Sequence, residues 1–135
     1  MNITLRSGER LYLNGAVIRV DRKTSIELMN DAAFLIESHV MQAAEATTPL
    51  RQIYFAVQIA LMDPSSGSAV APLIETLIAQ TEAAVNSATL RAGLETVRAL
   101  IARGRHFEAL KTLRANYPVE QIEMTPVPVA KRDAA

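Results

Sequence analysis

Residues 47–63, with the sequence TTPLRQIYFAVQIALMD, carry the strongest structural signal in the chain. Thr48 has a hydroxyl that can cap a helix by accepting a backbone N–H, and Pro49 has the φ angle that suits a first helical residue. Asp63 stands before Pro64, and a residue before proline avoids the α region. The sequence therefore predicts a helix that starts at Pro49 and stops before Asp63.

Apolar side chains occur on nearly every side of this predicted helix. Those on one face are Leu50, Ile53, Tyr54, Val57 and Leu61, and those elsewhere are Phe55, Ile59 and Met62. A helix that is apolar all round has to be covered all round. Because the residues before it have the pattern of strands and those after it the pattern of helices, we predict that it is buried between a sheet and other helices.

A β-hairpin is predicted upstream, with strands over residues 10–13 and 16–20. Asn14 and Gly15 form its turn, because both central residues of a type I′ turn need a positive φ. The two-residue turn fixes the register, and the expected opposite pairs are Leu13 with Ala16, Tyr12 with Val17, Leu11 with Ile18, and Arg10 with Arg19. Further short strands are expected over residues 3–5, 26–28 and 33–37. The residues expected to face the core are Leu11, Leu13, Ala16, Ile18 and Val20.

The opposite placement of Arg10 and Arg19 is unfavourable unless an anion lies between them. One interpretation is an external anion, such as phosphate. The other is that the strand over residues 26–28 pairs beside residues 16–20 and places Glu27 next to Arg19. The sequence leaves both interpretations open.

Three more helices are predicted after Pro64, over about residues 69–86, 88–103 and 105–116. Ser87 caps the helix over residues 88–103, and Gly104 is placed to end it in a left-handed conformation. Residues 118–135 are predicted to be an extended or disordered tail. We therefore predict a single α+β domain: a small N-terminal antiparallel β module (residues 1–46), then a bundle of about four helices (residues 47–117).

The composition excludes several classes of protein. The chain has 135 residues, half of them apolar, which is enough for one domain with a core. It has no cysteine, which excludes disulfides, thiolate catalysis and cysteine-bound metal sites. No nucleophile–base–acid trio, glycine-rich phosphate loop or histidine–carboxylate metal motif occurs at a suggestive spacing. We therefore expect no enzymatic activity, no metal and no cofactor.

The N-terminus does not have the pattern of a signal peptide, because Arg6, Glu9 and Arg10 interrupt any apolar run. No apolar run reaches the roughly 18–20 residues needed to cross a bilayer. We expect a cytoplasmic protein that does not enter the membrane. The formal net charge is zero, so binding to nucleic acid would have to depend on a local patch.

Residues 91–114 are the best candidate for such a patch, with six cations against Glu95 and Glu108. The cations are Arg91, Arg98, Arg103, Arg105, Lys111 and Arg114. They either form a basic face that follows a nucleic-acid backbone or are ordinary solvated side chains near helix ends. The candidate RNA-binding residues are Arg98, Arg103, Arg105, Lys111 and Arg114, with Arg6, Arg10 and Arg19 as a second patch.

Several segments stand out as a set: residues 7–10 (SGER), residues 13–18 (LNGAVI), Met41, residues 48–55 (TPLRQIYF) and residues 109–114 (ALKTLR). Together they resemble the FlbT family of flagellum-biosynthesis repressors. The resemblance covers roughly residues 3–117, and its most specific parts are the Asn-Gly turn and the RQIYF segment. None of these segments is a catalytic signature.

The resemblance implies a post-transcriptional regulator of alphaproteobacteria that associates with the 5′ untranslated region of flagellin mRNA and promotes its degradation. It also implies action beside a small helical partner, FlaF, that is linked to flagellin secretion. The alternative is a protein-interaction adaptor that binds a flagellin, its secretion chaperone or a FlaF-like partner, with indirect effects on the mRNA. A homo-oligomer is compatible with either role.

Overall fold

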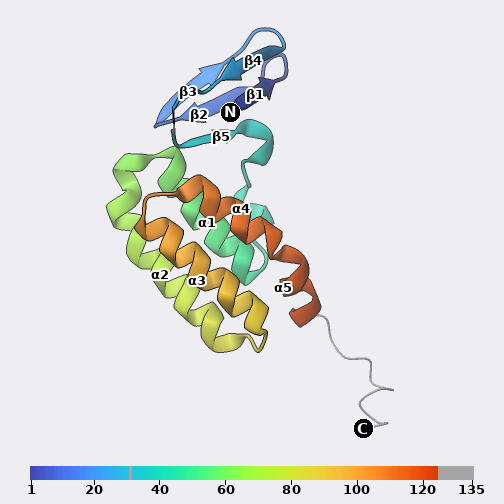
Figure 1. Ribbon diagram of the computed structural model, residues 1–135, viewed down its shortest axis with the longest axis vertical. Coiled ribbons are helices and arrows are strands. Elements are labelled where there is room, and N and C mark those ends of the chain that lie inside the picture. Colours follow the sequence, from blue (N-terminus) through green and yellow to red (C-terminus); the bar gives the residue numbers. More distant parts are fainter. Residues whose placement is uncertain (31, 125–135) are drawn as a thin grey trace.

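The structure, a computed structural model, describes residues 1–30 and 32–124. Its strands gather at one end of the molecule and its helices form a bundle beside them (Figure 1). The strands are β1 (Asn2–Leu5), β2 (Arg10–Leu13), β3 (Ala16–Arg19), β4 (Thr24–Glu27) and β5 (Phe34–Ile36). The α-helices are α1 (Pro49–Met62), α2 (Gly67–Ala84), α3 (Ala88–Ala102), α4 (His106–Ala115) and α5 (Tyr117–Met124). This arrangement confirms the predicted α+β class.

Helix α1 has the bounds that the sequence predicts. The Thr48 hydroxyl accepts a hydrogen bond from the Arg51 backbone N–H at 3.2 Å, and the helix ends at Asp63 before Pro64. Most of its side chains are buried against β5, α2 and α4, but Ile59, which the sequence predicts to be covered, is 37% exposed. The buried amide of Gln58 is satisfied by the backbone of Met41, with distances of 2.7 and 2.9 Å.

Strands β1 to β4 form one long antiparallel ribbon, here called the β ribbon (residues 1–28). Asn14 and Gly15 have φ angles of 49° and 84° in its turn, and all four predicted pairs of β2 and β3 are confirmed. β1 pairs with β4, as in Asn2 opposite Glu27, and β2 pairs with β3, as in Arg10 opposite Arg19. In both strand pairs the numbers of opposite residues add up to 29, so the two pairs share one register. β1 and β2 therefore lie along one arm, and β3 and β4 along the other.

The predicted position of residues 26–28 is wrong, because β4 pairs with β1 and not with β3. The second arm continues straight past the interruption at residues 20–23 instead of folding back on itself, so Glu27 lies opposite Asn2 and far from Arg19 in the register. A carboxylate beside Arg10 is instead supplied from the β5 side of the ribbon. β5 pairs with β2, and Glu37, which follows it in the short 3₁₀ helix Glu37–His39, accepts a hydrogen bond from the Arg10 backbone N–H at 3.0 Å.

The predicted core face of the hairpin is correct for one strand only. Leu11 of β2 is fully buried, but all four residues of β3 are exposed, including Ala16 and Ile18. The reason is that β5 and the helices approach the ribbon from the β2 side (Figure 1). The ribbon therefore has a small core of its own, which consists of Ile3, Leu5, Leu11 and Phe34.

The prediction of an extended tail from residue 118 is wrong for residues 118–124, which belong to α5. Pro118 is the second residue of this helix, where its missing N–H costs no intrahelical hydrogen bond. Glu120 is only 2% exposed, and its carboxylate accepts a hydrogen bond from the Leu50 backbone N–H at 2.7 Å. Glu123 accepts another from the Asn86 backbone N–H. Residues 125–135 of the predicted tail lie outside the described residues.

We predict that Glu120→Ala lowers the free energy of unfolding by about 2 kcal/mol, because it removes a charged acceptor from the first turn of α1 and leaves a buried N–H unpaired. Glu120→Gln keeps an acceptor oxygen and should lose less. Urea unfolding followed by circular dichroism measures both changes. Glu27→Ala is the matched control, since Glu27 is exposed in β4. Equal stability of Glu120→Ala and wild type would contradict this role.

Candidate functional site

Arg98, the first of the predicted RNA-binding residues, is held by carboxylates. It lies on α3 and pairs with Glu82 and Glu75 of α2 at 2.7 and 2.9 Å, and with Glu95 of its own helix. Hydrogen bonds to Glu82 and Glu75 raise the pKa of Arg98. The Arg98 guanidinium lowers the pKa of Glu82 in turn. Arg98 therefore connects α3 to α2, and its charge is neutralised by carboxylates of the same chain.

Arg114 also has a structural partner. Its guanidinium donates a hydrogen bond to the Tyr54 hydroxyl at 2.8 Å and lies over the Tyr54 ring. The Tyr54 hydroxyl donates in turn to the carbonyl of His39 at 3.0 Å. Burial lowers the pKa of His39, and the nearby charge of Arg114 lowers it further. These contacts join α4, α1 and the segment that follows β5.

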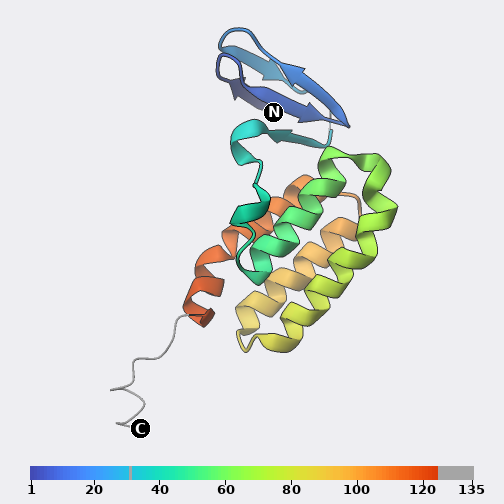
Figure 2. The same ribbon diagram turned by 180° about the vertical axis from the view of Figure 1, so that it is seen from behind.

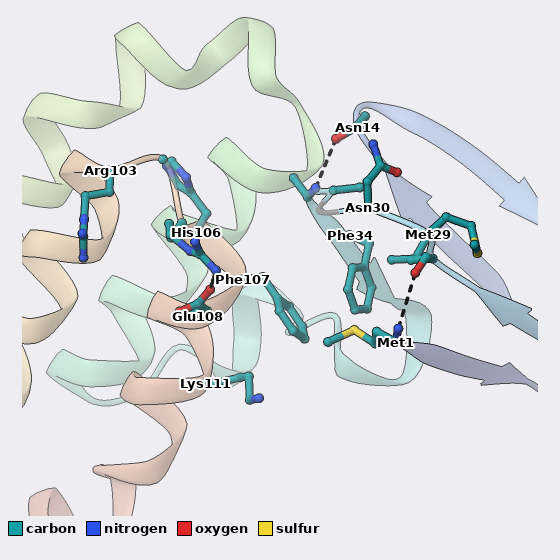
Figure 3. A pocket seen from close by; sticks show the side chains of 15 residues that line it. Met1, Asn14, Met29, Asn30, Phe34, Arg103, His106, Phe107, Glu108 and Lys111 are labelled. Atoms are coloured by element: carbon teal, nitrogen blue, oxygen red, sulfur yellow. Dashed lines mark hydrogen bonds and ion pairs between the residues drawn. The ribbon is translucent and has the colours of Figure 1, made fainter.

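The other three predicted RNA-binding residues of this stretch, Arg103, Arg105 and Lys111, line one cleft of about 780 Å³. The cleft lies between the end of the β ribbon and the turn from α3 to α4 (Figure 3). One wall, here called the ribbon wall, combines the end of the ribbon with residues that follow it: Met1, Leu28, Met29, Asn30 and Phe34. The opposite wall, here called the helical wall, adds His106, Phe107 and Glu108 to the three cations. Among the described residues that line the cleft, three side-chain cations thus stand against one carboxylate, in a chain whose net charge is zero.

Local geometry places these cations at the cleft. Gly104 has a φ of 74° and ends α3 as predicted, with the Arg105 N–H bonded to the carbonyl of Leu100 at 2.8 Å. Arg103 and Arg105 therefore flank a tight turn, and Arg105 pairs with Glu108. The Lys111 ammonium lies 5.6 Å from the centre of the Phe107 ring. Among the described residues, Arg103 has no hydrogen-bond or ion-pair partner through its side chain.

Two aromatic rings connect the walls of the cleft. Phe34 of β5 and Phe107 of α4 lie with their ring centroids 4.4 Å apart and their planes tilted by 33°. Phe107 packs against the cores of both the ribbon and the bundle. This contact sets the distance between the two walls, so the cleft results from the packing of α4 against β5.

The second predicted patch does not join this cleft. Arg10 and Arg19 lie opposite each other on the exposed part of the ribbon. Arg6 lines a separate hollow of about 560 Å³ with Lys23 and His39, and the two hollows share no lining residue. The eight candidate residues therefore do not form one continuous basic surface.

The apolar wall of the cleft cannot be recognised from the sequence. Met1 and Met29 are large apolar side chains that are 63% and 84% exposed, and Asn30 lies beside Met29 on the same wall. Their closeness to α4 is a contact between distant parts of the chain, which periodicity cannot detect. Phe107 is half-buried, and its position between two cores depends on the same kind of distant contact.

Other kinds of site are not apparent within residues 1–30 and 32–124. That part of the chain contains no group of three or more histidine, aspartate or glutamate side chains arranged to hold a metal ion. Its helices include none with the length and hydropathy required to cross a membrane.

The fold and the site together define a small α+β protein with a cationic cleft between a β ribbon and a helical bundle. Comparison with protein families identifies it further. The family model described as flagellar protein FlbT matches residues 1–124, and the chain therefore belongs to the FlbT family. No solved structure matches the chain.

Three relatives illustrate the similarity. A probable flagellum biosynthesis repressor protein FlbT from Chelativorans sp. is 45% identical over 119 residues, covering 88% of this chain and 82% of the relative. The protein named FlbT 2 from Bradyrhizobium diazoefficiens is 49% identical over 121 residues, with 90% and 89% covered. The one from Brucella ovis is 45% identical over 129 residues, with 96% and 85% covered. These names support a repressor role in flagellum biosynthesis.

The assignment of Arg98 to the fold leads to a prediction about its carboxylate partners. Because the pKa of Glu82 is lowered, ionised Glu82 stabilises the fold above the ordinary glutamate pKa of 4.5, and this stabilisation is lost as the pH falls through the lowered pKa. The pKa of Glu95 is raised, chiefly by its hydrogen bond with Glu82.

We expect Glu82→Gln to lower the free energy of unfolding at pH 7 by roughly 1 kcal/mol, the upper end for a solvent-accessible ion pair. Glu95→Gln should cost less, because the Glu95 side chain is more exposed than that of Glu82 and its charge is repelled by Glu82. Urea unfolding at pH 7 and pH 3 measures both, and the Glu82→Gln loss should shrink at the lower pH. Equal losses for the two variants at pH 7 would show that the network is wrongly assigned.

Proposed function

We propose that this protein is a post-transcriptional repressor of flagellin synthesis, which associates with the 5′ untranslated region of flagellin mRNA and promotes its degradation. Membership of the FlbT family supports the flagellar role. The observation that carries the RNA contact is the convergence of Arg103, Arg105 and Lys111 on one cleft. The protein works in the cytoplasm without a cofactor, and a cellular nuclease cleaves the messenger.

Arginine is suited to this contact because its planar guanidinium donates two parallel hydrogen bonds to a phosphate. Arg103 and Arg105 are both exposed and lie on either side of one turn, so they reach neighbouring phosphates of the same strand. Lys111, one and a half turns into α4, adds a third positive charge. Arg98 and Arg114 support the surface from behind by holding the helices in place.

An adaptor role is the second candidate. Leu73 of α2 is 51% exposed, and Ile59 of α1 is exposed on the neighbouring helix. The two helices lie side by side on the face of the bundle seen in Figure 2. An apolar surface of this kind suits the helix of another protein. A flagellin, its secretion chaperone, a FlaF-like partner or a second copy of this chain would then bind here, and the effect on mRNA would be indirect.

Direct binding predicts salt-sensitive affinity of the purified protein for the flagellin leader RNA. Three cations that meet phosphates of a single strand give a slope of about −2 in a plot of log affinity against log salt. Arg103→Ala with Arg105→Ala should weaken binding about 100-fold, at about tenfold for each lost charged contact. Fluorescence anisotropy with labelled leader RNA across a salt series measures both quantities.

Two further variants serve as controls in this titration. Arg22→Ala removes one exposed arginine from the turn between β3 and β4, and it is the match for Arg103→Ala. Arg10→Ala with Arg19→Ala tests the second patch with the same change of charge as the main double variant. If pure protein does not bind the leader but binds it after a FlaF-like partner is added, direct contact is wrong and the adaptor role is supported.

A further inference from the structure

We infer that the cleft between the β ribbon and the α3–α4 turn holds unpaired nucleotides, so that this protein contacts its RNA as a single strand and not as a duplex. The phosphates lie on the helical wall and a base lies against the ribbon wall. This inference rests on the proposed function and adds where, and in what form, the RNA binds.

The arrangement of charge favours a single strand. A duplex needs cations that follow its backbone over a long face, but Arg98 is occupied by three carboxylates and Arg114 by Tyr54. The basic stripe predicted along α3 and α4 is therefore interrupted on both sides of the turn. The cations that remain, Arg103, Arg105 and Lys111, line one hollow and cannot track a long backbone.

The size of the cleft also favours a single strand. Its volume of about 780 Å³ lies within the roughly 300–1,000 Å³ that is typical of pockets for small organic ligands. One or two nucleotides have this size. In a duplex the bases are stacked and paired inside the helix, so none of them can enter a hollow of this kind without being unstacked.

The two walls match the two halves of a nucleotide. The helical wall offers guanidinium and ammonium groups for phosphate. The ribbon wall offers the exposed, polarisable side chains of Met1 and Met29 for the face of a base, and the exposed amide of Asn30 for its edge. In Figure 3, Met29 and Asn30 lie on the ribbon side of the cleft and Arg103 and Lys111 on the helical side, and the Met29 side chain is directed away from the helical wall. Asn14 is not available, since its side chain accepts a hydrogen bond from the Ala33 N–H.

The absence of tryptophan from the chain allows a direct test. Met29→Trp places a single fluorophore on the ribbon wall, and base stacking on an indole quenches its fluorescence. Val17→Trp is the matched control, because Val17 is 62% exposed on β3 and does not line the cleft. Urea unfolding of both variants checks that the fold is intact.

Each variant is titrated with a 12-nucleotide single-stranded segment of the flagellin leader, and with the same segment annealed to its complement. The single strand should quench Met29→Trp and leave Val17→Trp unchanged. The duplex should bind at least tenfold more weakly. Adding Arg103→Ala and Arg105→Ala to Met29→Trp should abolish the quenching at the same RNA concentrations.

The outcomes separate the inference from the proposed function. If wild-type protein binds the leader but Met29→Trp is not quenched, or if the duplex binds as well as the single strand, the inference is overturned and the repressor role stands. If wild-type protein binds no leader RNA, direct RNA contact and the inference both fail. If a poly-glutamate peptide quenches Met29→Trp at lower concentration than the RNA does, the cleft is a site for an acidic protein segment and the inference is again overturned.

Discussion

Helix α1 has so little polar surface that it has to be enclosed, and this requirement organises the molecule. β5, α2 and α4 each cover one side of it. The polar groups that enclosure would leave unpaired have specific partners: Gln58 bonds to the backbone of Met41, and the Leu50 N–H bonds to Glu120. Since an unpaired buried group costs about as much as a hydrogen bond is worth, these partners are part of the condition for folding. The position of α4 against α1 also brings Phe107 to Phe34, and the cleft exists because of it.

The cations of residues 91–114 divide into two roles. Arg98 and Arg114 connect helices through carboxylates and a tyrosine, and Arg91 bonds to the carbonyl of Val85 near the end of α2. Arg103 and Lys111 have no carboxylate partner among the described residues, and Arg105 has only a local one. The number of cations in a helical sequence therefore overstates the positive charge that is available to a partner. The geometry of the carboxylates on the neighbouring helix decides which cations remain.

The features that the sequence predicted correctly depend on neighbouring residues. The Asn14–Gly15 turn set the hairpin register, Thr48 and Pro49 set the start of α1, and Gly104 set the end of α3. The pairing of β4 with β1 was missed, because nothing local distinguishes an arm that continues straight from one that folds back. Helix α5 was missed because it is short and carries Pro118, although proline in a first turn is compatible with a helix. The cleft was missed since it joins residues about 75 positions apart, such as Asn30 and Arg105.

The hydrogen bond between Leu50 and Glu120 spans 70 positions of the chain, and this separation has a consequence for biosynthesis. The β ribbon is complete once its first 28 residues have been synthesised, and its small core once Phe34 has followed. The first turn of α1 must wait for its acceptor until Glu120 has been translated. A nascent chain that stalls before α5 therefore lacks the partner of the Leu50 N–H and the contacts of α5 with α3 and α4.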